Sequence, residues 1–109
     1  MIFVGSTSGR LASPYIGPYC AAKYALEAIA ESLRHELRPA GIRIVLIEPG
    51  AVKTPIWTKA LAGVDELERS LPSEALNRYQ RLFAAERKIL NRGAATGIPA
   101  DEVASAIRQ

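Results

Sequence analysis

Residues 42–48 read Ile-Arg-Ile-Val-Leu-Ile-Glu, and Pro49-Gly50 follow directly. An almost unbroken apolar run of this length is typical of a strand covered on both faces, as in a parallel sheet with helices packed on each side. Proline followed by glycine ends such a strand in a turn. We therefore predict a buried parallel strand over residues 42–48.

A long helix is predicted before this strand, from Tyr19 to Arg38. Pro39 and Gly41 give it a strong stop signal. Its apolar residues recur at the spacing of one helical face. They are Leu26, Ile29, Ala30, Leu33 and Leu37.

The chain opens with Ile2-Phe3-Val4, which reads as the end of a strand, and residues 6–18 are rich in glycine and proline like a loop. The order strand, loop, helix, strand is typical of a right-handed crossover unit in an α/β sheet. Ligands of such sheets bind at the carboxyl ends of the strands. Both loops of interest are expected there.

The second half shows weaker helical patterns. Trp57 to Ala62 could form a short helix, and residues 72–90 carry apolar side chains at roughly helical spacing. Residues 98–109 begin with a proline and acids that suit the start of a further helix. We predict a helical flap followed by the first turns of another helix.

Composition narrows the classes of function. The 109 residues are 49% hydrophobic and 23% charged, which suits one small soluble domain. The net charge of +3 comes from scattered residues, so nucleic-acid binding is not expected. The apolar start stops at Gly5, and neither a signal peptide nor a membrane span is predicted.

The chain has one cysteine, Cys20, and one histidine, His35. An internal disulfide is therefore excluded, and no cysteine or histidine metal cluster can form. We expect no metal site and a reducing, cytoplasmic setting.

Tyr19 and Lys23 stand four residues apart, and hence on one face of the predicted helix. A nearby ammonium favours the phenolate, which suits a proton donor and acceptor for a carbonyl/alcohol pair. Alone, this motif is weak, because a partly buried tyrosine one turn from a solvated lysine is the ordinary explanation.

The surrounding motifs supply the context. The motifs are Ser6-x-x-Gly9, Tyr19-x-x-x-Lys23-x-Ala25-Leu26, Leu33-Arg34-His35-Glu36-Leu37 and Pro49-Gly50-x-Val52-x-Thr54. In order and spacing they resemble the catalytic half of the short-chain dehydrogenase/reductase family, over about the first 58 residues. The resemblance implies the C-terminal half of a Rossmann-like, doubly wound parallel sheet.

The resemblance also implies catalytic roles. Tyr19 matches the tyrosine that protonates the carbonyl oxygen in reduction or takes the alcohol proton in oxidation. Lys23 matches the lysine that binds the nicotinamide ribose and favours the phenolate. Ser6 matches the serine that hydrogen-bonds the substrate oxygen, with Ser8 as the rival. Gly5 stands where many members have another serine.

The implied cofactor is NAD or NADP. Pro49, Gly50, Val52 and Thr54 match the turn that holds its nicotinamide end, together with Tyr19 and Lys23. The family's glycine-rich strand-turn-helix for the pyrophosphate has no counterpart here. Residues 93–97 hold two glycines, but they follow no predicted strand and precede a proline, so we reject them as a phosphate loop.

We therefore expect one incomplete domain, with residues 1–54 as catalytic core, 55–97 as substrate flap and 98–109 as the start of a further helix. Trp57 is either a wall of the substrate pocket or a flap residue packed on the domain. Phrases of the sequence are similar to the retinol and hydroxysteroid dehydrogenase branch, which implies a small, lipophilic alcohol or carbonyl substrate. The full-length form is expected to be a homo-oligomer.

Two other interpretations stay open. The chain could be a non-catalytic short protein that acts as an assembly module through its long helix, which in this family pairs between subunits. It could also be a truncated reading frame.

Overall fold

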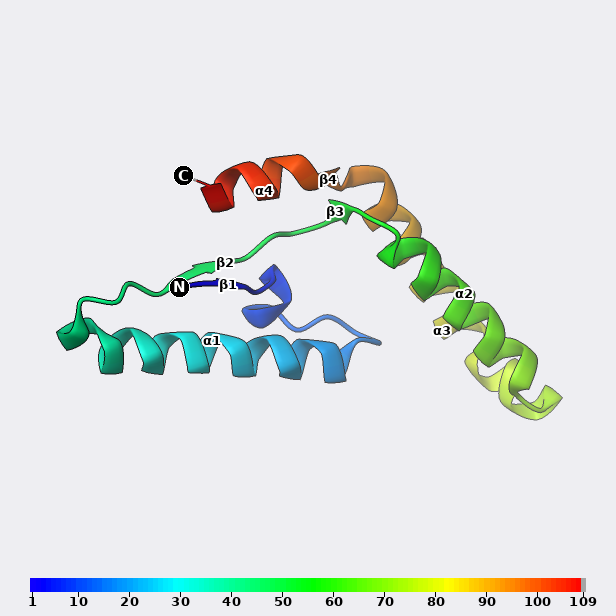
Figure 1. Cartoon of the computed structure of the whole chain (residues 1–109). Helices are drawn as coiled ribbons and strands as arrows, with labels where there is room; N and C mark the ends of the chain where they lie inside the picture. The colour runs from blue at the N-terminus through cyan, green and yellow to red at the C-terminus, as the bar shows by residue number, and fades with distance from the viewer. Residues whose placement is uncertain (109) are drawn as a thin grey trace. The chain divides into compact units, whose positions relative to one another are not determined.

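The structure is a computed structural model that describes residues 1–108. Its elements follow the order shown in Figure 1. They are β1 (Ile2–Val4), η1 (Thr7–Gly9), α1 (Gly17–Leu37), η2 (Arg38–Ala40), β2 (Val45–Ile47), β3 (Val52–Lys53), α2 (Ile56–Ser70), α3 (Ser73–Thr96), β4 (Ile98–Pro99) and α4 (Ala100–Arg108). The protein is a small α/β structure in which helices predominate.

The chain forms two compact units. The first holds residues 1–50 together with the chain from Val103 onward, and the second holds residues 51–102. No helix among residues 1–108 is long and apolar enough to cross a membrane. The division into catalytic core and flap stays a prediction.

In the first unit, β1 and β2 pair in parallel, with Phe3 opposite Leu46. The ladder continues beyond the strands, because the Gly5 N–H donates to the Ile47 carbonyl at 2.7 Å. Figure 1 shows the two strands side by side, with α1 running along them. The expected strand–loop–helix–strand unit is therefore present, and α1 forms its crossover.

Strand β2 is shorter than the predicted range 42–48 and covers Val45–Ile47. The physical reason is its partner, since β1 supplies three residues for a parallel ladder. Ile44 is buried, but Ile2 and Val45 are each 45% exposed. Within residues 1–108 the two strands therefore keep exposed apolar side chains, and a sheet covered on both faces stays a prediction.

Helix α1 begins at Gly17, two residues before the predicted start. Pro18 lies in its first turn, where the fixed φ of proline suits a helix and the missing N–H costs nothing. The helix buries Cys20 and Ala30. At its far end η2 closes on Gly41, whose φ of 73° lies in the left-handed region that favours glycine.

The second unit is built on α2 and α3, which pack against each other (Figure 1). Its buried core consists of Val64, Phe83 and Leu90, and partly buried residues surround it. Those residues are Trp57, Ala60, Leu61 and Leu71. Both helices are longer than predicted.

The apolar stripe explains the length of α2. Positions 57, 60, 61 and 64 follow the i, i+3, i+4, i+7 spacing of one helical face, so the helix continues beyond the predicted end at Ala62 to Ser70. Helix α3 likewise runs past residue 90 to Thr96. The parallel pair β3–β4, which joins Val52 to Ile98, was not predicted because two-residue strands leave no pattern to detect.

Candidate active site

The structure brings Tyr19 and Lys23 together on α1. The Lys23 ammonium lies 5.7 Å from the centre of the Tyr19 ring. The same ammonium donates to the carbonyl of Val4, the last residue of β1, at 3.3 Å. Tyr19 is 41% exposed, so a ligand can reach its side chain. The pair therefore sits beside the carboxyl end of β1.

Ser6 follows β1 by two residues and is buried, with 8% of its surface exposed. Its Oγ accepts a hydrogen bond from the Ser8 backbone N–H at 3.2 Å, which caps η1. Within residues 1–108 the Ser6 hydroxyl proton is donated to no acceptor. Ser6 thus keeps a fixed oxygen with a proton to donate.

The glycine of the Ser6-x-x-Gly9 motif has a packing reason. A β-carbon on Gly9 would lie 3.0 Å from the Lys23 carbonyl oxygen and 3.1 Å from Glu27 Cγ. Only glycine lets the η1 backbone approach this turn of α1 so closely. The motif therefore places the loop after Ser6 directly on the turn of the helix that carries Lys23.

An ion-pair network that the sequence analysis missed ties three segments together. Arg10 Nε donates to Glu48 Oε1 at 2.7 Å, and an Arg10 terminal nitrogen lies 3.3 Å from Glu27 Oε2. The Tyr24 hydroxyl donates to the Arg10 carbonyl at 2.6 Å. The loop after η1, helix α1 and the end of β2 are thereby joined. The only feature of the sequence that pointed to this network was Glu48, a charged residue at the end of an apolar strand.

The two carboxylates of this network differ in their electrostatics. The hydrogen bond from Arg10 holds the pKa of Glu48 below its ordinary value of 4.5. The pKa of Glu27 is raised, first by desolvation and then by the neighbouring Glu48 carboxyl, and these outweigh the attraction of Arg10. The buried Glu27 Oε1 has no hydrogen-bond partner among the described residues, which explains why desolvation prevails.

The predicted nicotinamide turn has residues in both units. In the first unit, the Pro49 carbonyl accepts from the Thr7 N–H at 3.1 Å, and a β-carbon on Gly50 would meet nothing within 4 Å. In the second unit, Val52 belongs to β3. Thr54 Oγ1 lies 3.5 Å from the Ile56 N–H at the start of α2.

The donor set suits a polar organic ligand. The ammonium of Lys23 and the hydroxyls of Tyr19 and Ser6 can serve ribose hydroxyls and a carbonyl oxygen. Residues 1–108 contain no group of three or more His, Cys, Asp or Glu side chains that could hold a metal ion. The hydroxyl and ammonium donors are of the kind that the nicotinamide end of the expected cofactor needs, and their role in binding it stays a prediction.

Trp57 packs into the second unit, which agrees with the packing role that the sequence left open. Its Nε1–H donates to the Val52 carbonyl at 2.7 Å. The indole packs against Gly93, where a β-carbon would lie only 2.4 Å from Trp57 Cη2 and Cζ3. At residue 97 a β-carbon would lie 2.9 Å from the Lys53 nitrogen. Gly93 and Gly97, which the sequence did not support as a phosphate loop, make room for Trp57 and β3.

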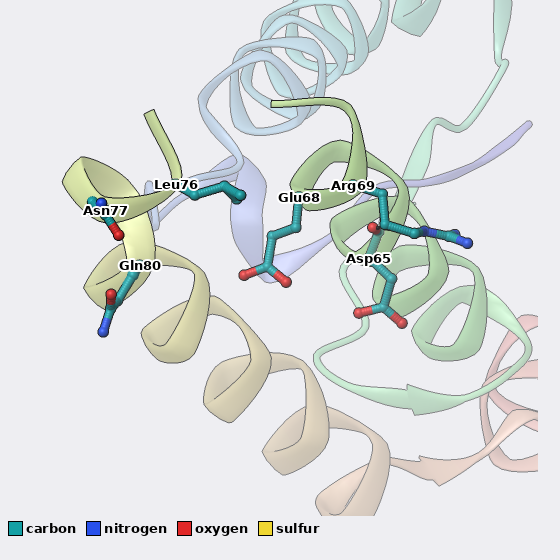
Figure 2. A pocket seen from close by; sticks show the side chains of 6 residues that line it. All are labelled: Asp65, Glu68, Arg69, Leu76, Asn77 and Gln80. Atoms are coloured by element: carbon teal, nitrogen blue, oxygen red, sulfur yellow. Dashed lines mark hydrogen bonds between the residues drawn. The ribbon is translucent and has the colours of Figure 1, made fainter. Parts of the chain in front are cut away.

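A hollow of about 740 Å³ opens on the second unit, lined by residues of α2 and α3 (Figure 2). The lining residues are Asp65, Glu68, Arg69, Leu76, Asn77 and Gln80. No residue of the predicted site lines it, and all of its lining residues except Leu76 have polar or charged side chains. We therefore do not assign the expected lipophilic substrate to this hollow.

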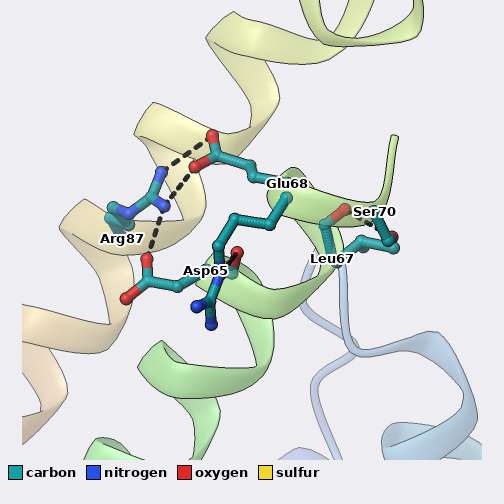
Figure 3. A network of polar contacts seen from close by, with 6 residues as sticks. Asp65, Leu67, Glu68, Ser70 and Arg87 are labelled. Atoms are coloured by element: carbon teal, nitrogen blue, oxygen red, sulfur yellow. Dashed lines mark hydrogen bonds and ion pairs between the residues drawn. The ribbon is translucent and has the colours of Figure 1, made fainter. Parts of the chain in front are cut away.

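Next to it, Arg87 of α3 holds two carboxylates of α2 (Figure 3). It donates to Asp65 Oδ1 at 2.6 Å and to Glu68 Oε1 at 3.0 Å, with a second contact to Glu68 Oε2. The hydrogen bond from Arg87 holds the pKa of Glu68 below its ordinary 4.5. This network joins α2 to α3, and we call these two helices the hairpin.

Residues 1–65, which carry the Tyr19–Lys23 pair, match the family model described as short chain dehydrogenase. The chain belongs to the short-chain dehydrogenase family.

One relative is the NADPH-dependent 3-dehydrocapnine reductase of Ornithobacterium rhinotracheale, which is 38% identical over 95% of this chain and 34% of its own length. An uncharacterized oxidoreductase of Bacillus subtilis, YusZ, is 38% identical over the whole chain and 37% of its own length. Human 17-beta-hydroxysteroid dehydrogenase type 1 is 31% identical over 86% of the chain and 29% of its own length.

The chain thus spans about a third of the length of these relatives. Membership of the short-chain dehydrogenase family, and the NADPH named for the 3-dehydrocapnine reductase, support the expected use of NAD or NADP.

Proposed function

We propose that this chain carries the proton-transfer site of an oxidoreductase that uses NAD or NADP to interconvert a carbonyl compound and an alcohol. The observation that supports it best is the Lys23 ammonium 5.7 Å from the centre of the Tyr19 ring, anchored on the end of β1. This arrangement joins a proton donor to a neighbouring cation beside the loop of Ser6.

In this proposal, each side chain acts at one atom. The Tyr19 hydroxyl gives a proton to the carbonyl oxygen in reduction and takes it back in oxidation. Lys23 donates to the ribose hydroxyls of the cofactor. Ser6 donates a hydrogen bond to the same carbonyl oxygen, with its Oγ fixed by Ser8. When bound, the cofactor supplies or accepts the hydride.

The proposal extends to the segment 49–54 and to the hairpin. Pro49, Gly50, Val52 and Thr54 would hold the nicotinamide end, and residues 55–97 would close over the substrate. The half-exposed Ile2 and Val45 support a larger, doubly wound parallel sheet in which further strands and helices cover β1 and β2.

The substrate class is proposed from relatives. A hydroxysteroid dehydrogenase among them supports a lipophilic alcohol or ketone. A single buried, free cysteine suits a reducing, cytoplasmic setting.

Assembly through α1 is a second candidate function. Ile29 and Tyr24 on this helix are 51% and 44% exposed, which favours a homo-oligomer through this helix.

A chimera tests the main proposal. Residues 1–109 would replace the homologous third of the 3-dehydrocapnine reductase, and oxidation of NADPH would be followed with that enzyme's substrate and a series of ketones. We expect turnover that needs both NADPH and ketone. A chimera that melts cooperatively and binds NADPH, yet turns over none of the ketones, would refute the proposal.

A further inference from the structure

The only tryptophan of the chain joins the helical hairpin to the strand that precedes it. Trp57 lies in the first turn of α2, and its Nε1–H donates to the carbonyl of Val52 in β3 at 2.7 Å. An indole N–H has one proton to donate, so this bond fixes the direction of the ring. The carbonyl that it binds lies two residues before Thr54.

The other side of the ring rests on α3. Gly93 is the residue that leaves space for it, because a β-carbon there would overlap with Trp57 Cζ3 and Cη2. Farther along the chain, the Gly97 N–H donates to the Gly93 carbonyl at 3.0 Å, and Gly97 packs on the Val52–Lys53 backbone. The Ile98 N–H then donates to the Ala51 carbonyl at 2.9 Å.

These contacts form a closed circuit at the base of the hairpin. It runs from Val52 through Trp57 to Gly93, continues along α3 to Gly97, and returns to β3 through the pairing of Val52 with Ile98. The backbone of β3 is thus held from one side by a strand and from the other by an indole. Trp57 also packs against the buried core of the hairpin, which consists of Val64, Phe83 and Leu90.

We propose that Trp57 is a positioning residue, which couples the α2–α3 hairpin to β3 and so sets the backbone conformation that presents Val52 and Thr54. The inference rests on the proposed function, in which this backbone holds the nicotinamide end of the cofactor. Trp57 itself touches neither cofactor nor substrate in this account.

Fluorescence of the 109-residue chain gives the first test, since Trp57 is the only tryptophan. Gly93→Ala should move the emission to longer wavelength and make it easier to quench with acrylamide. Gly63→Ala is the matched control, because Gly63 is also helical but a β-carbon there meets nothing within 4 Å. Alanine is the better helix former at both positions, so propensity alone predicts no loss.

Hydrogen exchange of the Ile98 amide gives the second test, because this amide bonds β4 to the Ala51 carbonyl. Gly93→Ala and Trp57→Phe should each speed its exchange about three- to tenfold, as expected when one hydrogen bond's worth of local stability is lost. The double variant should exchange no faster than Trp57→Phe alone, since phenylalanine lacks the outer indole carbons that meet the new methyl group.

The chimera then links the conformation to the cofactor. Gly93→Ala should raise the KM for NADPH about three- to tenfold and leave kcat at saturating NADPH within about twofold, because the proton-transfer pair lies on α1. Gly63→Ala should change neither parameter.

The outcomes separate the two proposals. Unchanged emission and unchanged Ile98 exchange in Gly93→Ala would overturn the role of Trp57 and leave the proposed function standing. The role of Trp57 would also be overturned if the parent chain had the same emission spectrum in buffer as in denaturant, because the indole would then be in contact with solvent in both. Faster exchange with an unchanged KM for NADPH would refute the assignment of the cofactor to this turn, and with it the positioning role.

Discussion

The Lys23 ammonium lies 5.7 Å from the centre of the Tyr19 ring and donates to the Val4 carbonyl at 3.3 Å. Lys23 therefore contacts both the Tyr19 ring on α1 and the end of β1. A shift of the helix relative to the strand would displace its ammonium.

Replacing Tyr19 by phenylalanine in the chimera should remove the proton donor and keep the ring. General acid catalysis is typically worth about a hundred- to ten-thousand-fold, so we expect kcat to fall by at least about a hundredfold with little change in NADPH affinity. Tyr79→Phe is the matched control, since Tyr79 is 42% exposed and Tyr19 41%. Retention of more than about a tenth of the turnover, with chemistry limiting, would rule out the role of Tyr19.

Ser6→Ala and Ser8→Ala should separate the two serines. Ser6 is buried and its Oγ accepts from Ser8, so its removal takes away the proposed donor to the carbonyl oxygen and the cap of η1. We expect kcat of the chimera to fall about tenfold or more, as for the loss of a hydrogen bond to developing charge. In Ser8→Ala the backbone N–H still donates to Ser6, and steady-state rates should stay near the parent values. A larger loss of kcat in Ser8→Ala than in Ser6→Ala would show that Ser8 is the donor to the carbonyl oxygen.

The carboxylates bound by Arg10 should respond in opposite directions to neutralisation. The lowered pKa of Glu48 means that folding favours its charged form, so Glu48→Gln should destabilise the chain at pH 7. The raised pKa of Glu27 means that folding favours its neutral form, so Glu27→Gln should be neutral or stabilising. Urea unfolding at pH 7 measures both. Equal destabilisation would show that the Arg10–Glu27 contact outweighs desolvation.

The pH dependence of these two variants gives a sign that can be checked. Stability from Glu48 is present above its unfolded value of 4.5 and is lost as the pH falls through its lower folded pKa. Stability from Glu27 is present below 4.5 and is lost as the pH rises through its higher folded pKa. Parent and variant urea midpoints should therefore converge at low pH for Glu48→Gln.

Arg87→Gln should destabilise the hairpin more than Arg78→Gln does. Arg87 is 31% exposed and binds both Asp65 and Glu68, whereas Arg78 is 67% exposed and pairs within its own helix. Exposed pairs of the second kind contribute little. Circular dichroism during urea unfolding compares the two, and similar midpoints would show that the Arg87 network adds nothing.

The Arg87 effect should fade in acid. Because the pKa of Glu68 is lowered, its contribution to stability is present above 4.5 and disappears as the pH falls through the lower folded value. The midpoint difference between Arg87→Gln and the parent should therefore be constant at neutral pH and shrink below about pH 4. A difference that persists in strong acid would point to lost packing of the Arg87 stem.

The local features of this protein could be read from its sequence. Helical periodicity, Pro39 and Gly41 placed α1 within two residues at each end, and the spacing of four brought Tyr19 and Lys23 to one face. Such features depend on residues within one or two turns of the chain, where backbone geometry alone decides which side chains are neighbours.

Only the tertiary structure decided the contacts between distant segments. Arg10 and Glu48 are 38 residues apart in the chain, and nothing in the pattern of either segment indicates that they pair. The indole of Trp57 beside Gly93, and the two-residue ladder of Val52 with Ile98, are equally invisible in sequence. In each case a single side chain or a ladder of two residues makes the contact, which is too short to leave a periodic pattern in the sequence. The length of β2 likewise depended on how many residues β1 offered as a partner.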